Sequence, residues 1–445
     1  MSGEHADRRA VAVWLIAAFV YFLAVFHRAS FGVAGLEAQE RFGVGAAALG
    51  TFAVLQVGVY AAMQIPTGVL VDRFGPRKVL FAAALFLGIG QFLFAVAHSY
   101  PLGLLARGVL GLGDALTFVS VLRLIAAHFS ARRYPVFMSL TGALGFLGNL
   151  VATAPLSALL AGPGWLPVFL AASLGTTGYA LVVALRVRDT PNGETHRGES
   201  ISVRSVLRQI AQAWRVPGTR LGFWVHFTTM FGQNVLTLAW GVPYLVRSQG
   251  MSVQAASGLL MVFVFGAMVG GPLVGTMIGR WPELRMPLVS GYLTGALVVW
   301  GLLLSFPAVL PVWVLVCCFA FLSLGGPASM IGFALARDYN PMRRVGVATG
   351  VVNAGGFTAT TITALTIGVL LELSDGLGQQ NSFRIALLSV VLLLLVGSWR
   401  VALWWRRARA AVFAAQARGE QVPVQLRRRR WDRHVPAEEP TAISA

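Results

Sequence analysis

Residues 68–78 read Gly68-Val69-Leu70-Val71-Asp72-Arg73-Phe74-Gly75-Pro76-Arg77-Lys78, a short charged stretch between two long apolar segments at roughly 47–71 and 79–97. Each segment is long enough to cross a bilayer as a helix, which takes about 20 apolar residues. Charges are costly in hydrocarbon, so a tight loop that carries one acid and three bases must lie at a membrane face. Its excess of basic residues assigns that face to the cytoplasm.

The composition of the whole chain is that of a membrane protein. The chain has 445 residues, of which 56% are hydrophobic and 12% are charged, and its mean hydropathy is +0.72. A soluble domain does not need this much apolar surface. A β-barrel would show alternating segments of about ten residues instead of continuous apolar runs. We therefore expect an all-α polytopic membrane protein.

The apolar runs predict twelve membrane-spanning helices. These cover residues 11–35, 47–71, 79–97, 102–127, 135–160, 165–185, 220–246, 253–279, 286–306, 311–334, 345–371 and 384–405. The first run follows Arg8 and Arg9 and is too long for a signal peptide, so we interpret it as the first spanning helix.

The basic residues follow the topology of such a chain. Of the 35 Lys and Arg residues, 28 fall in the N-terminus, the even-to-odd connections and the C-terminal tail, and 3 fall in the opposite connections. This split predicts that both termini are cytoplasmic. It also accounts for the net charge of +18, which therefore does not indicate binding to nucleic acid.

The chain divides at its longest connection, which contains an amphipathic run near 201–214. We expect a cytoplasmic N-terminus, a six-helix bundle, a cytoplasmic central loop, a second six-helix bundle and a basic cytoplasmic tail, at residues 1–10, 11–185, 186–219, 220–405 and 406–445. In the tail, Arg427-Arg428-Arg429-Arg430 precedes Trp431, a pattern that suits anionic headgroups of membrane lipids.

The two predicted bundles repeat weakly, so we expect them to be pseudo-symmetric. Gly68-x-x-x-Asp72-Arg73 recurs as Gly275-x-x-x-Gly279-Arg280, and Thr141-Gly142 with Gly148 recurs as Thr349-Gly350 with Gly356. Parallel repeats of six helices are typical of transporters whose two bundles rock around a site near the middle of the membrane.

Ionisable residues at bilayer depth are the first candidates for function in such a protein. Asp114 is the carboxylate that we place deep in a helix, and Arg107 lies seven residues before it on the same helical face. Gly111 lies between them and leaves room for something to approach. The pair is either structural, neutralised through a neighbour or water, or functional. In the functional interpretation, Asp114 takes and releases a proton while Arg107 orients Asp114 or the substrate.

The second deep arginine is Arg28, some 17 residues into the first helix and preceded by His27. Its guanidinium offers a planar fork of donors that suits a carboxylate. The alternative is that Arg28 pairs permanently with Asp114. Arg123 lies near the cytoplasmic end of the fourth helix, where its side chain can reach the interface, so we expect it to be structural.

The pattern Gly-x-Leu-x-Asp-Arg-x-Gly-x-Arg-Lys at 68–78 resembles the signature loop between the second and third helices of the major facilitator superfamily. The resemblance implies a secondary transporter with two helical bundles around a central cavity. It also implies a gating role for the residues of that motif, which in this chain are Gly68, Asp72, Arg73, Gly75, Arg77 and Lys78. In related transporters the acid of the loop interacts with the start of the eleventh helix, here near Val345. We therefore expect Asp72 to latch the cytoplasmic side.

Two further patterns resemble the anion:cation symporter branch of this superfamily. They are Tyr21-x-x-x-x-Phe26-His27-Arg28-x-Ser30 in the first helix and Arg107-Gly-Val-Leu-Gly111-Leu-Gly-Asp114 in the fourth. The resemblance implies that Arg28 binds the substrate anion, with His27 and Arg107 at the same site, and that Asp114 takes part in proton coupling. His27 stands where proton-coupled members often carry an acid, which leaves one carboxylate in place of two.

The seventh predicted helix carries Gln233 and Asn234. Amides within a spanning helix need hydrogen-bond partners, which either a neighbouring helix or a substrate supplies. We expect both residues to line the cavity and to contact substrate.

These observations predict a proton-coupled transporter of a small organic anion, with a carboxylate as its charged group, acting as a monomer in the plasma membrane. No phosphate-binding loop of the G-x-x-x-x-G-K-[S/T] type is present, so ATP is not expected to drive it. No catalytic residue, cofactor or metal site is predicted. The alternatives are a drug or metabolite exporter of the same superfamily, and a membrane sensor that has this fold and does not transport.

Overall fold

The computed structural model of the chain describes residues 2–44, 46–192, 203–306 and 309–420, together with 422 and 426. Within these residues the chain forms helices and connecting turns, and no strand. The Arg427–Arg430 run and Trp431 lie outside the described residues, as does part of the central loop.

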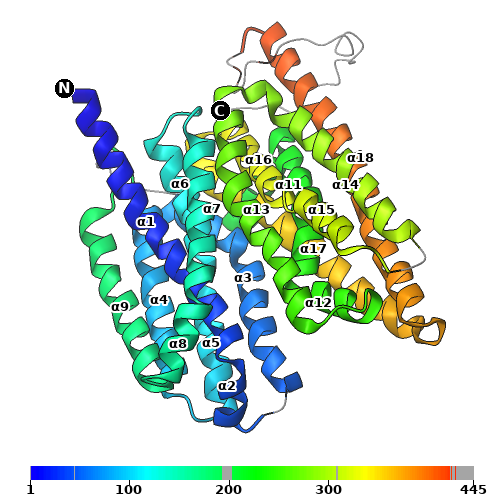
Figure 1. Ribbon diagram of the computed structural model, residues 1–445. Coiled ribbons are helices and arrows are strands. Elements are labelled where there is room, and N and C mark those ends of the chain that lie inside the picture. The colour runs from blue at the N-terminus through cyan, green and yellow to red at the C-terminus, as the bar shows by residue number, and fades with distance from the viewer. Residues whose placement is uncertain are drawn as a thin grey trace. The chain divides into compact units, whose positions relative to one another are not determined.

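The helices of the first half of the chain run from blue to green in Figure 1. They are α1 (Ser2–Val33), α2 (Gly35–Phe42), α3 (Ala46–Phe74), α4 (Pro76–Val96), α5 (Tyr100–Ala115), α6 (Thr117–His128), α7 (Tyr134–Val151), α8 (Ala154–Ala161), α9 (Trp165–Arg186) and α10 (Val203–Arg215). The last of these, α10, occupies the amphipathic run of the central connection.

The second half continues through longer helices and several short turns. They are α11 (Pro217–Val235), η1 (Leu236–Trp240), α12 (Gly241–Pro243), η2 (Tyr244–Ser248), α13 (Val253–Arg280), η3 (Pro282–Leu284), α14 (Arg285–Ser305), α15 (Val312–Leu322), α16 (Gly325–Tyr339), η4 (Met342–Arg344), α17 (Val345–Leu373), η5 (Asp375–Leu377) and α18 (Gln379–Ala417).

Helices lie over all twelve predicted ranges, so the helical membrane-protein class is confirmed for the described part of the chain. Eleven of these helical segments are long and apolar enough to cross a membrane. The remaining range, predicted at 220–246, is a helical run from Pro217 to Ser248 that contains the two π-helical turns η1 and η2. Pro243 has no amide hydrogen to donate, which breaks the regular α-helical ladder here.

Three predicted helices are interrupted by turns that the apolar pattern did not reveal. The fourth is divided at Leu116, the fifth at 152–153 and the tenth at 323–324. In the fifth and tenth helices, Pro155 and Pro327 follow the break by a few residues and cannot donate the backbone hydrogen bond that would close it. The last helix is longer than predicted, because α18 runs on to Ala417.

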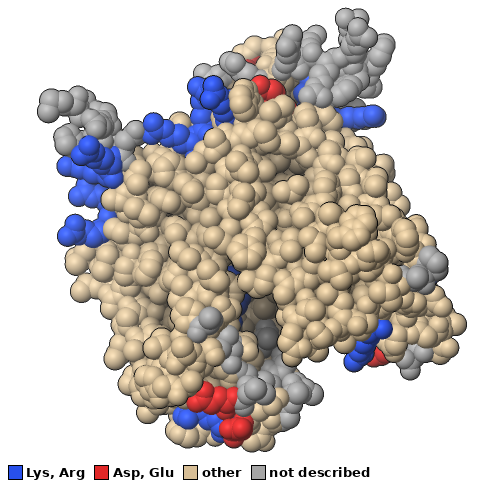
Figure 2. Space-filling view, in the orientation of Figure 1, with Lys and Arg blue, Asp and Glu red and all other residues tan. Residues whose placement is uncertain are grey.

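The chain folds into two compact units. The first comprises Met1–Ser130, Leu140–Ile210 and Met342–Gly350, and the second comprises Ala131–Ser139, Ala211–Pro341 and Val351–Ala445. On the visible face of each unit, charged side chains lie toward the two ends, and the outer surface between them is almost free of charge (Figure 2). This distribution suits a helical protein that is surrounded by lipid at its middle.

Each unit has its own apolar core. In the first unit an aromatic cluster fills the end that holds α2, where Phe94 packs against Trp165 with ring centroids 4.9 Å apart. The Trp165 indole nitrogen donates to the Ala95 carbonyl oxygen at 3.1 Å, which satisfies its one polar group. In the second unit Trp300 is almost fully buried in a core built from α11, α14, α16 and α18.

Glycines allow α5 to lie unusually close to its neighbours in the first unit. A Cβ added at Gly111 would come within 2.8 Å of the Gln56 carbonyl oxygen on α3, and one at Gly113 within 2.7 Å of the Leu87 amide nitrogen on α4. The space beside Gly111 is therefore filled by the backbone of α3. Gly111 does leave room for another group to approach, as expected, but the group that approaches is α3 and not a substrate.

We expect Gly111→Ala to destabilise the protein by about 1–3 kcal/mol, because the new methyl group meets backbone atoms that cannot move aside. Gly108→Ala is the matched control on the same helix, since a Cβ there would meet the Leu55 side chain at an ordinary 3.6 Å. Thermal unfolding of the two purified variants makes the comparison. Equal melting temperatures for both would contradict the close approach of α5 and α3.

Candidate functional site

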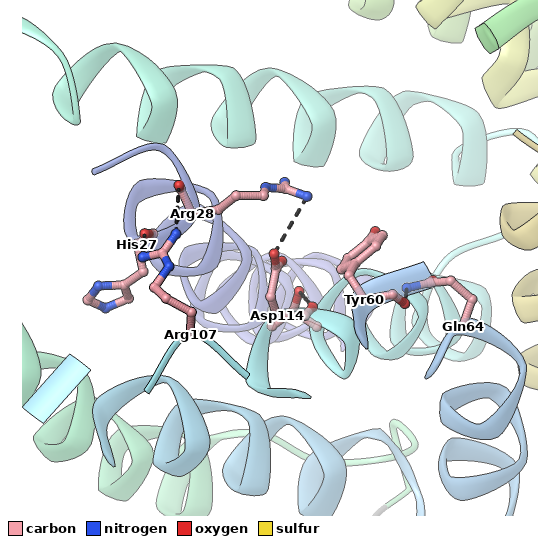
Figure 3. A network of polar contacts seen from close by, with 7 residues as sticks. His27, Arg28, Tyr60, Gln64, Arg107 and Asp114 are labelled. Carbon is pink, nitrogen blue, oxygen red and sulfur yellow. Dashed lines mark hydrogen bonds and ion pairs between the residues drawn. The ribbon is translucent and has the colours of Figure 1, made fainter. Parts of the chain in front are cut away.

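An ion pair joins α1 to α5 in the interior of the first unit (Figure 3). The Arg28 Nη1 atom lies 3.5 Å from the Asp114 Oδ2 atom. The Asp114 side chain is fully buried, whereas 29% of the Arg28 side chain is exposed. The sequence left two alternatives for Arg28, pairing with Asp114 or binding a substrate anion, and the structure contains the contact with Asp114. Arg28 is the accessible member of this pair.

The carboxylate of Asp114 is held loosely. Neither of its oxygens accepts a hydrogen bond from another described group, so the contact with Arg28 is its principal stabilisation. Its backbone is fixed more firmly, because the Thr117 hydroxyl donates to the Asp114 carbonyl oxygen at 2.7 Å, across the break between α5 and α6. Because the Asp114 backbone is fixed and its carboxylate has few partners, the carboxylate can lose its contact with Arg28 without a change in the fold.

Arg107 contacts the backbone of α1 instead of the carboxylate. Its guanidinium donates to the carbonyl oxygens of His27 and Arg28, both at 3.3 Å. It also lies 4.7 Å from the ring centroid of Phe31 and 5.4 Å from that of Phe94. Because Arg107 is almost fully buried, these contacts position the segment that carries Arg28, and its role toward substrate stays a prediction.

His27 belongs to the same network, on the side away from Asp114 (Figure 3). Its Nε2 atom lies 2.8 Å from the Thr176 Oγ1 atom of α9, and the residue is fully buried. The histidine therefore ties α1 to α9. A substrate-binding role for His27 stays a prediction.

A polar stripe of α3, which was not predicted from the sequence, lies on the other side of Asp114 from His27 (Figure 3). The Arg28 guanidinium carbon is 5.3 Å from the ring centroid of Tyr60, and the Gln64 side chain donates to the Tyr60 carbonyl oxygen at 2.8 Å. Gln56, Tyr60 and Gln64 recur every four residues in an apolar helix. This spacing places them on one helical face and was the available signal.

The predicted amides of the seventh helix lie in the second unit, with partners on neighbouring helices. Gln233 Oε1 accepts from the Gly326 amide of α16 at 3.0 Å, and Asn234 Nδ2 donates to the Thr360 hydroxyl of α17 at 3.3 Å. Both residues are buried. Either a neighbouring helix or a substrate was expected to supply hydrogen bonds to these amides. In the structure, neighbouring helices supply them.

The signature stretch centres on Asp72, which binds the first residues of α17 within the first unit. Its carboxylate accepts from the Gly346 amide at 2.9 Å and from the Val347 amide at 2.8 Å. Amides at the start of a helix have no partner within it and favour negative charge. Gly346 and Val347 directly follow Val345, near which the contact of Asp72 was predicted from the sequence.

Arg123 completes this arrangement and corrects an expectation. Its Nε atom lies 3.3 Å from the Asp72 Oδ1 atom, and both side chains are 4% exposed. The expected reach of Arg123 to the membrane interface is therefore wrong, because the acid of the signature loop draws the guanidinium inward. Gly68 lies beside the same contact, and any Cβ there would clash with the Gly346 carbonyl oxygen.

The remaining motif residues shape the turn between α3 and α4. Gly75 has a φ of +83°, which L side chains rarely adopt, and it immediately precedes α4. The Arg77 amide donates to Asp189 Oδ1 at 2.7 Å, and the Arg77 guanidinium donates to the Ala184 carbonyl oxygen, so the turn is fixed to the end of α9. Arg73 stacks on Phe74, and Lys78 is exposed.

Relatives of the chain include curated transporters. A protein described as "Probable sulfoacetate transporter SauU", from Cupriavidus necator, is 25% identical over 370 residues that cover 79% of this chain and 85% of the relative. "Probable galactarate/D-glucarate transporter GarP" from Escherichia coli is 26% identical over 400 residues, covering 82% and 87%. "Probable L-galactonate transporter" from Escherichia coli is 25% identical over 278 residues, covering 59% and 60%.

Solved structures share the fold. FucP, a transporter crystallised in an outward conformation, superposes with a TM-score of 0.67 at 13% identity, over 88% of this chain and 99% of FucP. The proton:xylose symporter XylE gives a TM-score of 0.64 at 15% identity, over 87% and 95%. The sequence model of the Major Facilitator Superfamily matches residues 17–354 and 223–437. The chain therefore belongs to the major facilitator superfamily and is a multi-pass membrane transporter.

Proposed function

We propose that the protein is a proton-coupled transporter of a small organic anion whose charged group is a carboxylate. The Arg28–Asp114 ion pair carries the proposal. Arg28 is 29% exposed while its partner is fully buried, so an incoming anion reaches the guanidinium and not the acid. A substrate carboxylate offers the same two oxygens as Asp114 and can take its place on the arginine.

The relatives support an organic anion as the class of substrate. The relatives are named as transporters of sulfoacetate, galactarate, D-glucarate and L-galactonate. All four compounds carry acidic groups that are charged at neutral pH. Three of the four also carry several hydroxyl groups. The polar stripe of α3 next to Arg28 suits such a substrate, because its amide side chains can donate to and accept from hydroxyls.

Proton coupling follows from what happens to Asp114 when substrate takes its arginine. The Asp114 carboxylate has no other hydrogen-bond partner in the described part of the chain. A buried carboxylate that loses its cation is strongly destabilised in the charged form, so it takes up a proton instead. Release of substrate returns Arg28 to Asp114 and expels the proton. Substrate and proton therefore bind together and leave together.

The contact of Asp72 with the start of α17 serves in this proposal as the latch that holds the cytoplasmic side closed. Asp72 accepts from two amides at the helix start and pairs with Arg123, all in a buried setting. We further propose that the protein acts as a monomer in the plasma membrane. Both termini lie in the cytoplasm in this proposal, because 28 of the 35 basic residues lie on that side of the predicted topology.

Arg28→Lys should weaken anion binding roughly 10- to 100-fold, because it keeps the charge and loses one charged hydrogen bond of the fork. Arg28→Gln should abolish binding. Calorimetric titration with D-glucarate and sulfoacetate measures both. Arg384→Lys is the control, since Arg384 is also partly buried and binds backbone carbonyls in the second unit. Equal affinities in all variants would leave Arg28 as a structural residue.

Asp114→Asn should still bind the anion and exchange it across the membrane, but should not accumulate it when a pH gradient is imposed. The asparagine mimics the protonated acid permanently, so the carrier cycles without a proton. Counterflow and gradient-driven uptake into proteoliposomes separate the two activities. Accumulation by Asp114→Asn at the wild-type level would eliminate Asp114 as the proton carrier. Binding without counterflow in the wild type would favour a sensor.

Asp72→Asn should slow transport while leaving membrane insertion intact, because a neutral amide loses about 2 kcal/mol or more of interaction with the helix start and Arg123. Glu283→Gln is the matched control, as it removes an exposed acid from the corresponding connection of the second unit. Initial rates of uptake in proteoliposomes provide the comparison. A well-folded Asp72→Asn protein with wild-type turnover would rule out the latch.

A further inference from the structure

Arginine and tryptophan side chains alternate where three helices of the second unit meet. The end of α10, the start of α11 and residues 400–407 of α18 come together there. We call this set the Arg–Trp cluster, which consists of Trp214, Arg220, Trp224, Arg400, Trp404 and Arg407.

Two guanidinium groups share one indole at the centre of the cluster. The Arg220 guanidinium carbon lies 4.5 Å from the ring centroid of Trp404, and that of Arg407 lies 4.9 Å from the same centroid. Arg220 also lies 5.6 Å from the Trp214 ring and donates to the Trp214 carbonyl oxygen. These cation–π contacts favour the observed positions of both guanidinium groups.

The positive charge of this pair is not neutralised by the described part of the chain. Arg220 and Arg407 are close enough to repel one another. No described carboxylate forms an ion pair with either of them, or with Arg400. Fixed like charges without a counter-ion favour an anion with more than one oxygen, such as a phosphate, which a guanidinium binds through two parallel hydrogen bonds.

The surroundings of the cluster point to a lipid as the source of that phosphate. On α18, Leu392, Val396 and Trp399 are 64%, 49% and 60% exposed and lie on one helical face. Arg406 follows on that face and is also exposed. This apolar stripe therefore runs beside the cluster: Arg406 precedes Arg407 in the chain, and the Arg400 guanidinium carbon lies 5.0 Å from the Trp399 ring centroid. Tryptophans in such a position are typical of the membrane–water interface.

We propose that the Arg–Trp cluster binds the headgroup phosphate of an anionic phospholipid, whose acyl chains lie along the exposed apolar stripe of α18. The site is separate from the Arg28–Asp114 pair, which lies in the first unit, and from the Arg427–Arg430 run. The site requires both parts of the phospholipid, since the arginines bind the headgroup phosphate and the apolar stripe contacts the acyl chains.

The test is a binding titration of the full-length purified protein with short-chain phosphatidylglycerol, followed by thermophoresis in detergent. Phosphatidylcholine and inorganic phosphate form the two comparison arms. The wild type should bind phosphatidylglycerol more tightly than either. Each interfacial arginine contributes about fivefold in affinity, so Arg220→Gln/Arg407→Gln should bind phosphatidylglycerol roughly 30-fold more weakly.

Arg186→Gln/Arg188→Gln is the control, because it removes two exposed bases from the first unit and should leave the affinity unchanged. If the double variant of the cluster does not remain monodisperse, the exposed Arg407→Gln alone should lower the affinity about fivefold. Wild-type affinity in the cluster variants, or an equal loss in the control, would overturn the site. Inorganic phosphate binding as tightly as phosphatidylglycerol would overturn its assignment to a lipid.

Discussion

A carboxylate inside an apolar helical bundle is costly unless a cation meets it, and Asp114 is such a carboxylate. Its cation comes from α1, on the Arg28 side chain, so the pair links two helices that are distant in sequence. Arg107 holds the two carbonyl oxygens of the same segment of α1 and thereby fixes the point from which Arg28 reaches across. In this arrangement the second arginine positions the first, and the first is left accessible to a competing anion.

The signature stretch illustrates the same constraint at the end of the bundle. Asp72 is buried, and its charge is met by two helix-start amides and by Arg123. The repeat in the second half carries Gly279 at this position, where a Cβ would clash with the Arg132 carbonyl oxygen. The two halves therefore use corresponding residues differently: Asp72 makes charged contacts, whereas Gly279 allows close backbone packing.

Much of the fold followed from apolar patterning, because continuous apolar runs have few alternatives to spanning helices. Each of the twelve ranges contains helix in the described part of the chain, and the glycine-punctuated loop indicated the superfamily. The turns at Leu116 and at 323–324 were not predicted, since the apolar pattern runs on across them. Arg28 and Asp114 could be selected from the sequence because charges at bilayer depth are rare. Their pairing could not be decided, because it depends on how α1 and α5 pack. The direction of the Arg123 side chain was predicted wrongly for the same reason, since its partner is 51 residues away.

Proton coupling through Arg28 requires that substrate and Asp114 compete for this arginine, and proton uptake on binding measures that competition directly. Purified protein in weakly buffered detergent solution is mixed with a saturating organic anion such as D-glucarate, and a pH-sensitive dye follows the proton balance. We expect binding of the anion to withdraw protons from solution in the wild type, and Asp114→Asn to bind the anion without doing so. Binding to the wild type with no proton uptake, or the same uptake by Asp114→Asn, would contradict this coupling.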